Sequence, residues 1–520
     1  MHISNDLKIL DNRTRQSSRV DWIKVDDENP NKRKVLYDKL GEYIYQKYKN
    51  VWLMLTNEDK SEFWEYLPLT HNYSGDKSRQ DIAKTQVVWQ LSDIERVRTK
   101  VHQELKKHGL WSAKASKDTL AYIKEELACN SKTKAATVGR VKSNKILFAD
   151  GMLEFDLNGT THVFENSSER PHQFAKYYFT DFCDYSIKDA AKADNINAWF
   201  AETFKDSART LKQFIGYSYF TTYEPIQAYL IIKAGGGDGK STTIKFIENM
   251  FPLSEVSHVS LQALTQSEKN SKNFSLAELQ GKRLNARDDI TKDFIQDVSQ
   301  LKTLTGGGSI SASRKFKNET QFSNYAKLLF ACNSLPSFRD SSRGWGRRAY
   351  IITAHNIPNF NTKYDMQDLL NERGAFAIEC IKEFCDWMKQ EQTKNKEFAE
   401  LYRSQDTQNE VDDWKRENDP IQLFIDETLV PKTKKDVNGQ EFEVVATDEK
   451  ISINGMFRAY TAWTEQTKTG GGMGKIKFNR EFESHGFTKK KARTGHAVEW
   501  CWEQVRFNDD ILKNYLGVFL

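Results

Sequence analysis

The sequence predicts a multidomain α/β protein with a helical N-terminal region and a basic C-terminal domain. The chain has 520 residues, more than one hydrophobic core ordinarily accommodates, so we expect two to four domains. Between residues 226 and 390, apolar strand patterns alternate with helical patterns, as in an α/β domain. Basic residues are concentrated near the C-terminus, which indicates a charged surface there.

The remaining segments are assigned by their patterns. Residues 1–140 are rich in tyrosine and tryptophan, and we expect a helical scaffold or collar there. Residues 141–225 mix short strands with helices and lead into the core at 226–390 without a Pro/Gly-rich linker. The polar stretch 391–419 is typical of a helical connector, and residues 420–520 have the helix, helix and strand-pair pattern of a winged-helix domain.

Composition argues against several classes of protein. The mean hydropathy is −0.70, and no long uncharged apolar run occurs, so a membrane span is not expected. The first residues lack the apolar segment of a signal peptide. The six cysteines show neither a C-x-x-C pair nor zinc-ligand spacing. We therefore expect a cytoplasmic protein with buried thiols and no membrane partner.

A glycine-rich segment, AGGGDGKSTT at 234–243, has the spacing of a phosphate-binding loop. In the usual pattern, G-x-x-x-x-G-K-[ST], backbone amides hold phosphate, the lysine reaches the outer phosphates and the hydroxyl binds Mg²⁺. Ala234 replaces the first glycine, while Lys240 and Ser241 are in register. The predicted nucleotide-binding residues are Gly235, Gly236, Gly237, Asp238, Gly239, Lys240, Ser241 and Thr242.

The context of this segment separates it from two other glycine clusters. It follows an apolar run at 226–234 and precedes a helical pattern, and a helix N-terminus would add its amides to an anion site. The cluster TGGGMGKI, 469–476, has Ile476 where the hydroxyl should be, and TGGGSI, 305–310, has no lysine. We therefore expect ATP and Mg²⁺ at the first cluster, with an ordinary strand-to-helix turn as the alternative.

An acidic pair follows the loop. The segment LQGKRLNARDDI, 279–290, contains Asp288 and Asp289, and carboxylates at this point would hold Mg²⁺ and polarise water. Polar residues interrupt the run before the pair, so the expected strand is weak. A helix cap is an equal alternative for the two aspartates.

A stronger strand pattern comes next. Residues 328–332 are apolar and end at Asn333, and ligands of open α/β sheets bind at the carboxyl ends of strands. Fourteen and fifteen residues later come Arg347 and Arg348, whose guanidinium groups suit a developing phosphate charge. These three side chains extend the predicted nucleotide site.

The C-terminal region carries its own signal. Seven basic and two acidic residues lie between Lys475 and Arg493, a surplus as large as the +5 of the whole chain. A helix over 475–487 would bury Phe478 and Phe482, and a basic turn and a strand would follow. A helix with a basic wing can bind duplex DNA, and a solvated charged face is the alternative. The predicted DNA-binding residues of this region are Lys477, Arg480, Lys489, Lys490, Lys491 and Arg493.

The order of these motifs resembles the superfamily-three helicases, and within them the poxvirus-type and the phage or plasmid primase-helicases. That family has a phosphate loop, an acidic pair, a lysine-bearing hairpin, a strand ending in asparagine and an arginine finger, within an ATPase domain of the AAA+ class. The resemblance covers about 145–390, and 420–520 is similar to the family's winged helix. Residues before about 140 have no counterpart.

The resemblance implies a role for each matched residue. Lys240 and Ser241 would bind phosphate and Mg²⁺, Asp288 would bind the metal and Asp289 the attacking water, and Asn333 would sense the nucleotide. Two departures from the family pattern are Ala234 in place of the first glycine and the weak strand before Asp288. They put the rate of ATP hydrolysis in question more than its existence.

Other matched residues would act between subunits. Arg348, with Arg347 beside it, would reach the nucleotide of the neighbouring subunit, and Lys302 resembles a basic residue that crosses the same interface. A hairpin at 313–322 would enter the central channel with Lys317 near its tip. In the same hairpin Arg314 is displaced from the family's position for an arginine, and DNA binding is expected of it as well.

The implied function is that of an ATP-dependent DNA helicase and replication initiator of a phage, plasmid or genomic island. The resemblance implies a homo-hexamer with single-stranded DNA in its channel, and host replication proteins are candidate partners. One alternative is an origin-binding initiator whose ATP site only controls assembly. A small-molecule kinase is disfavoured, because it would need neither Asn333 nor a distant arginine pair.

Overall fold

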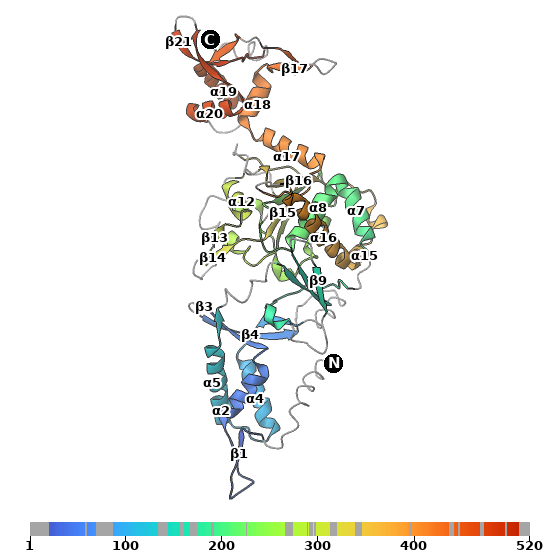
Figure 1. The fold of residues 1–520 in the computed structure, drawn as a ribbon, viewed down its shortest axis with the longest axis vertical. Coiled ribbons are helices and arrows are strands. Elements are labelled where there is room, and N and C mark those ends of the chain that lie inside the picture. The colour runs from blue at the N-terminus through green and yellow to red at the C-terminus, as the bar shows by residue number, and fades with distance from the viewer. Residues whose placement is uncertain are drawn as a thin grey trace.

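The computed structural model describes most of the chain as three parts that lie along its longest axis (Figure 1). The described residues are 20–57, 60–68, 87–133, 144–156, 161–165, 174–188, 192–224, 226–265, 274–288, 290, 295, 298–312, 320–338, 346–394, 398–435, 441–445, 448–467, 473–494 and 497–508. The protein is a multidomain mixed α/β structure whose central part is built on a parallel sheet of five strands.

The central sheet has the strand order β11-β12-β15-β10-β16. Its strands are β10 (Tyr229–Lys233), β11 (Val256–Ser257), β12 (Leu284–Arg287), β15 (Lys327–Cys332) and β16 (Ala349–Thr353). All neighbouring strands run parallel. Nearly every residue of β10, β15 and β16 is buried, because a parallel sheet covered on both faces requires continuous apolar strands.

Helices cover both faces of this sheet. Leu230 and Ile232 share a core with α7, α8, α9 and α16, whereas Tyr229 and Ile231 share another with α10, α12 and α17, as alternation along a strand requires. The helices of the central part are α7 (Asp194–Phe204), α8 (Ala208–Ser218), α9 (Lys240–Glu248), α10 (Leu261–Leu264), α12 (Val298–Leu304), α14 (Phe360–Lys363), α15 (Met366–Asn371), α16 (Arg373–Gln392) and α17 (Gln405–Glu417).

Two of the expected segments pack against the central sheet. The stretch 391–419, expected to be a helical connector, contains α17, whose Trp414 is buried and donates its indole N–H to the Pro336 carbonyl at 2.8 Å. The segment 141–225 shares a core with the sheet, since Phe148 and Phe214 belong to the same cluster as Leu230. The local sequence pattern does not reveal this long-range packing.

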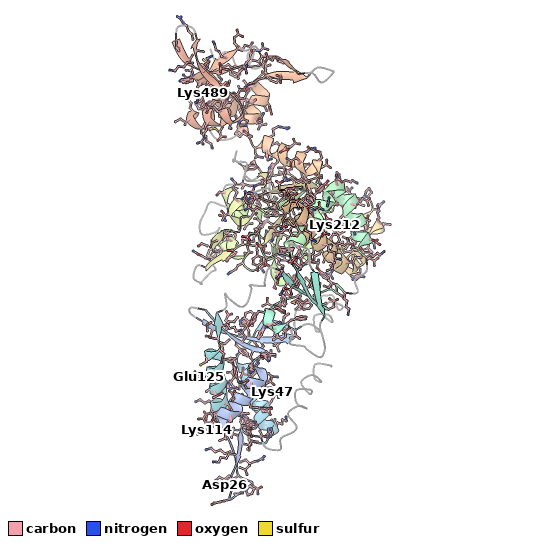
Figure 2. All side chains as sticks on the ribbon, in the orientation of Figure 1. Asp26, Lys47, Lys114, Glu125, Lys212 and Lys489 are labelled. Atoms are coloured by element: carbon pink, nitrogen blue, oxygen red, sulfur yellow. The ribbon has the colours of Figure 1, made fainter. Side chains whose placement is uncertain are left out.

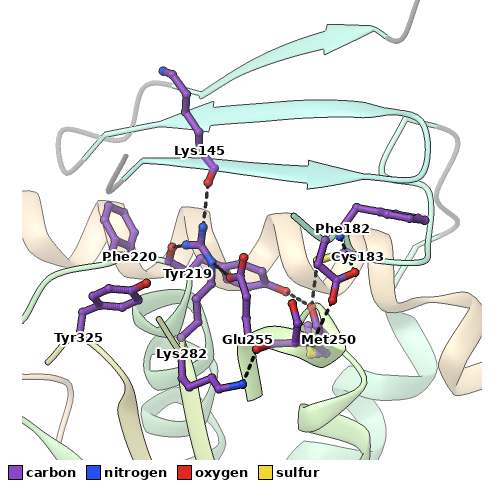
Figure 3. Close-up of polar contacts among 12 residues, drawn as sticks. Lys145, Phe182, Cys183, Tyr219, Phe220, Met250, Glu255, Lys282 and Tyr325 are labelled. Carbon is purple, nitrogen blue, oxygen red and sulfur yellow. Dashed lines mark hydrogen bonds and ion pairs between the residues drawn. The ribbon is translucent and has the colours of Figure 1, made fainter. Parts of the chain in front are cut away.

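A buried guanidinium joins the central sheet to a small sheet before it (Figure 3). Arg283, 1% exposed, donates to the carbonyls of Lys145 and Tyr219 and pairs with Glu255. Lys145 begins β7, so one side chain connects three segments of the fold. The small sheet, in the order β7-β8-β9, comprises β7 (Lys145–Phe148), β8 (Gly151–Phe155) and β9 (Thr161–Glu165).

The N-terminal part contains helices and, beside them, a sheet that the sequence did not lead us to expect. The sheet has four strands in the order β5-β4-β3-β6. Trp52, Phe63 and Trp89 lie in its strands, because aromatic side chains favour a half-buried pleated surface. The elements here are β1 (Ile23–Val25), β2 (Arg33–Val35), α2 (Tyr37–Tyr48), β3 (Trp52–Asn57), β4 (Lys60–Pro68), β5 (Val87–Leu91), α4 (Glu95–Lys107), α5 (Ala113–Cys129), β6 (Lys132–Thr133) and η1 (Ala175–Tyr177).

The C-terminal part packs three helices on a three-stranded antiparallel sheet of order β19-β21-β20. Phe424, Trp463 and Phe478 form its core with Trp502. The expected basic turn is instead the strand β20. The elements are α18 (Pro420–Thr428), β17 (Thr433–Lys435), β18 (Glu441–Glu443), β19 (Lys450–Ser452), α19 (Ile453–Thr467), α20 (Lys475–Ser484), β20 (Lys489–Thr494) and β21 (Ala497–Glu503).

The six cysteines are free thiols, and all except Cys129 are buried. Of the helices that the structure describes, none combines the length and the apolar character needed to cross a bilayer.

Candidate functional site

The glycine-rich loop has a backbone that only glycine adopts readily. Gly236, Gly237 and Gly239 have φ of +111°, +75° and +75°, in the left-handed region. Ala234 stands differently: it continues β10, is buried, and donates its N–H to the Cys332 carbonyl at 3.0 Å. The loop therefore accommodates alanine in place of the first glycine, since that position directly follows β10 and needs no glycine conformation.

The loop leads directly into a helix N-terminus. Helix α9 begins at Lys240, and the first helical bond at this end runs from Thr243 N–H to the Gly239 carbonyl at 2.9 Å. The amides of the first turn precede that bond and, with the helix dipole, form an anion site. Asp238 closes the loop internally, because its carboxylate accepts the Gly235 N–H at 2.6 Å.

Two predicted polar residues lie at the same edge of the sheet as the loop. Asp288 directly follows β12 and Asn333 directly follows β15, and the strands run parallel to β10. The register pairs Lys233 with Cys332, so Asn333 comes level with the start of the loop. Asn333 is exposed and Asp288 partly so, whereas Asp289 lies outside the described residues.

The polar residues that made the strand before Asp288 look weak have structural partners. Asn285 is buried in β12, where its amide oxygen accepts the Val259 N–H at 2.8 Å and its amide nitrogen donates to the Val259 carbonyl at 2.9 Å. Arg283, just before β12, is the buried residue that connects the central sheet to the small sheet. Asp288 therefore follows a strand whose first three residues are buried.

A further carboxylate lies near Asp288 that the sequence did not reveal. His258 Nδ1 is 3.2 Å from Glu248 Oε1 and 3.2 Å from the Ala286 carbonyl oxygen. Burial raises the pKa of Glu248, the charge of Asp288 raises it further, and His258 opposes both effects. Glu248 ends α9 and His258 follows β11, so no local motif marks this pair.

A second group missed by sequence reasoning holds the strand before the loop. Lys233 Nζ lies 2.7 Å from Glu410 Oε2, and Thr353 donates its hydroxyl to Glu410 Oε1 at 3.0 Å. One carboxylate of α17 therefore binds the carboxyl ends of both β10 and β16. The partners are up to 177 residues apart in sequence, and only the fold brings them together.

The arginine pair lies at the opposite edge of the sheet. Tyr229, the first residue of β10, donates its N–H to the Arg348 carbonyl at 2.9 Å. Five residues of β10 separate this point from the loop, or about 16 Å of extended strand. Arg347 and Arg348 both donate to the side-chain oxygen of Gln227. Burial and the neighbouring Arg347 lower the pKa of Arg348 from its usual range.

Two paired strands flank the predicted hairpin at 313–322, of which the structure describes only 320–322. β13 (Ser309–Ala312) and β14 (Thr320–Ser323) are antiparallel neighbours, and Lys302 lies in α12, which leads into β13. Arg314 and Lys317, expected near the tip, lie outside the described residues.

The C-terminal basic residues form an exposed surface on α20 and β20. As the spacing predicts, α20 buries Phe478 and Phe482 and leaves Lys477 and Arg480 exposed. Lys489 pairs with Glu483, and the ammonium group of Lys491 lies 5.7 Å from the centre of the exposed Trp500 ring. The other exposed basic residues of β20 are Lys490 and Arg493.

The donor set at the loop fits ATP and Mg²⁺. The helix amides and Lys240 offer positive charge to phosphate, and Mg²⁺ ordinarily takes one or two protein oxygens along with phosphate and water. The Ser241 hydroxyl, in the first turn of α9, and the Asp288 carboxylate, at the end of β12, are oxygens of that kind. Among the described residues no group of three histidine, cysteine or acidic side chains forms a metal centre.

Comparison with known proteins adds a family and two likenesses. Residues 232–348 match the model of a family of unknown function, DUF5906, a span from β10 to the arginine pair. No curated protein matches the chain. Two similar solved structures are both described as an apo structure of the NrS-1 C-terminal region. One is 12% identical, with a TM-score of 0.43 over 90% of this chain and 99% of that chain. The other is 12% identical, with a TM-score of 0.42 over 89% and 99%. TM-scores this low carry no inference about activity.

Proposed function

We propose that this protein is an ATP-dependent DNA helicase and replication initiator of a phage, plasmid or genomic island. One observation carries the proposal: the phosphate loop, Asp288 and Asn333 meet at one edge of a parallel sheet, while Arg347 and Arg348 lie at the other. The first group suits nucleotide hydrolysis within one chain. The second suits action on a neighbouring chain.

The strand order supports assignment of the core to the AAA+ class. β15, which ends at Asn333, lies between β10, which carries the loop, and β12, which ends at Asp288. An amide placed between the phosphates and the metal carboxylate can orient the attacking water. The order of the five strands is the one typical of AAA+ ATPases, and the family resemblance of the motifs predicts the same class.

The chain's own residues would act as follows. Lys240 and the α9 amides would hold the outer phosphates, and Ser241 and Asp288 would hold Mg²⁺, which neutralises phosphate charge when bound. Asp289 would polarise the water that Asn333 orients. Glu410 would keep β10 and β16 together at this edge through Lys233 and Thr353.

The position of the arginine pair supports the proposal of a ring. About 16 Å of strand separates Arg348 from the loop of its own chain, so a role in hydrolysis requires another chain's nucleotide. We propose a homo-hexamer with single-stranded DNA in its channel, held by Arg314 and Lys317. Lys302 would act at the same interface, and host replication proteins would be further partners.

A mixing experiment tests the ring. Arg348→Ala should lower ATPase by about 10³ to 10⁵, the usual worth of an arginine finger. Mixing Arg348→Ala with Lys240→Ala should restore part of the activity, because some interfaces then combine an intact loop with an intact arginine. The exposed Arg416 of α17 gives the matched control Arg416→Ala, which should leave the rate unchanged. Absence of recovery in the mixture, with both variants folded, would rule out action between subunits.

The second candidate function is an origin-binding initiator that uses ATP only for assembly. The exposed basic surface of α20 and β20 favours duplex binding under either function. Phosphate release with and without single-stranded DNA separates the two, together with strand displacement on a forked duplex. A helicase should show DNA-stimulated release and strand separation. Assembly without either result would select the initiator.

A further inference from the structure

The N-terminal part contains a pocket that the proposed helicase activity does not use. It has a volume of about 510 Å³, within the range of small-molecule sites. It lies where α2, β3 and the end of α5 meet the η1 segment. Its lining residues are Tyr45, Lys49, Asn50, Trp52, Leu53, Met54, Trp89, Leu127, Asn130, Lys132, Ala175, Lys176 and Tyr178. We call it the aromatic pocket.

The floor of the aromatic pocket is apolar, and its polar edges are satisfied within the protein. Trp52 and Trp89 are buried. The indole N–H of Trp52 donates to Glu65 Oε1 at 3.0 Å, and that of Trp89 donates to the Ala175 carbonyl at 2.8 Å. Both rings are therefore fixed, and both indole N–H groups already donate within the protein.

One wall is formed by a residue in a strained conformation. Tyr178 has φ of +57°, which costs energy for a side chain other than glycine. Its ring is held by two neighbours: Lys132 donates to its hydroxyl, and the Trp89 ring lies 5.9 Å away, centre to centre. Tyr178 and Tyr45, on α2, are both partly exposed, so their rings are accessible to a ligand.

The rim of the aromatic pocket is positively charged. Lys49, Lys132 and Lys176 come from three separate segments and are all exposed. None of the thirteen lining residues is acidic. Three ammonium groups around an apolar floor favour a ligand that is flat at one end and anionic at the other.

We propose that the aromatic pocket binds a nucleotide unit, with its base against the tyrosine walls and its phosphate on the lysines. Base stacking on aromatic rings combined with a basic groove is the usual means of holding single strands without sequence preference. An acidic peptide would satisfy the lysines but would leave the aromatic floor without a partner. The nucleotide unit can belong to a free nucleoside phosphate or to a DNA strand.

Photo-crosslinking tests the proposal on the full chain. A dT oligonucleotide carrying 5-bromodeoxyuridine should crosslink to peptides that contain Tyr45 or Tyr178, as identified by mass spectrometry. The same crosslinks should form in Lys240→Ala, because that variant alters only the ATP site. Failure of the helicase proposal would thus leave this result intact. Crosslinks confined to other parts of the chain would overturn the pocket assignment.

A charge-matched pair of variants isolates the lysines. Lys132→Gln with Lys176→Gln should reduce the crosslink yield at Tyr178 at least fivefold and lower its salt slope by about 1.4, since each single-strand phosphate contact contributes about 0.7. The control is Lys106→Gln with Lys114→Gln, the same charge change in the last turn of α4 and the first turn of α5; Lys114 is labelled in Figure 2. Equal yields in the two double variants would refute the phosphate contacts.

Competition identifies the source of the nucleotide. Unlabelled dTMP that suppresses the Tyr178 crosslink at millimolar concentration would identify a free nucleotide as a sufficient ligand. Suppression by unlabelled dT oligonucleotide alone would identify a strand. Failure of both competitors to suppress the crosslink would show that it is non-specific, and the proposal would fall.

Discussion

Two helices of this protein begin with lysine after a glycine cluster, and their surroundings differ. Helix α9 follows AGGGDG and begins at Lys240, while α20 follows TGGGMG and begins at Lys475. Gly239 before α9 has φ of +75°, whereas Gly474 before α20 has φ of −68° and an extended ψ. The two sequences look alike, and their backbones differ at the residue that starts the helix.

The difference lies in what precedes the glycines. The α9 loop follows a buried parallel strand, and Asp288 and Asn333 follow neighbouring strands at the same edge of the sheet. The helix before α20 is α19, and no strand of the described chain lies between them. At the position of Ser241, α20 has Ile476, 89% exposed. Both segments have the glycines of a turn, and only the segment before α9 follows a strand of the central sheet.

The sharpest test of this comparison exchanges each lysine for alanine. Lys240→Ala should abolish ATPase and unwinding with the fold intact, because it removes the charge that neutralises the outer phosphates. Lys475→Ala is the matched variant and should leave ATPase unchanged. Steady-state phosphate release and circular dichroism measure both. Normal turnover by Lys240→Ala would remove the basis for the active-site assignment.

Sequence patterns predicted the glycine-rich loop and the strand before Asn333 better than the strand before Asp288. The loop, the strand before Asn333 and the buried face of α20 could be predicted because each pattern lies within one continuous segment of the sequence. The β12 strand looked weak because Asn285 and Arg283 are polar, and their partners, Val259 and Glu255, belong to another segment. Glu410 could not be found for the same reason.

The N-terminal part was predicted only in part. Tyr43, Tyr45 and Tyr48 lie in the helix α2, whereas Trp52 and Trp64 lie in strands of one sheet. Aromatic residues occur in both kinds of element, and short strands of mixed polarity give weak periodicity. The pairing of β3 with β4 and β6 settles the structure, and it depends on contacts between distant segments.

The second test concerns the basic strand that follows α20. Changing Lys489, Lys490 and Lys491 to glutamine should weaken duplex binding and lower its salt slope by up to about 2.7, since each phosphate contact contributes about 0.9. DNA-independent ATPase should persist, because the nucleotide site belongs to the other helix. Fluorescence anisotropy at several salt concentrations measures the slope. An unchanged slope and affinity would make this region a protein-contact surface.

The third test compares the glycines themselves. Gly237→Ala places a side chain at φ of +75° and should cost about 1–2 kcal/mol of loop stability, seen as weaker ATP binding. Gly474→Ala meets φ of −68° and open space, so its effect on unfolding should stay within about 0.5 kcal/mol. Nucleotide titration and denaturant unfolding measure the two. Equal tolerance at both positions would contradict the backbone difference.

The smallest expected effect on stability concerns the C-terminal ends of α9 and α20. Each of the two helices is followed by a residue whose side chain donates to the carbonyl four residues earlier. After α9, Asn249 donates to the Lys245 carbonyl at 2.7 Å. After α20, the protonated His485 donates through Nδ1 to the Glu481 carbonyl at 2.8 Å. Only the second cap titrates. His485 Nε2 also lies 2.9 Å from Asp419 Oδ2, and Asp419 caps α18 by accepting the Ile421 N–H.

The hydrogen bond to Asp419, opposed by burial, raises the pKa of His485 above 6.5. Because the folded pKa is the higher one, the stabilisation is fully present below about pH 6.5 and is lost as pH rises through the folded pKa. It should amount to about 1 kcal/mol or less, since the pair is partly exposed. His485→Gln should make unfolding of the C-terminal part less dependent on pH between 6 and 9, while Asn249→Gln should not. An NMR titration that placed the His485 midpoint below 6.5 would contradict the assignment.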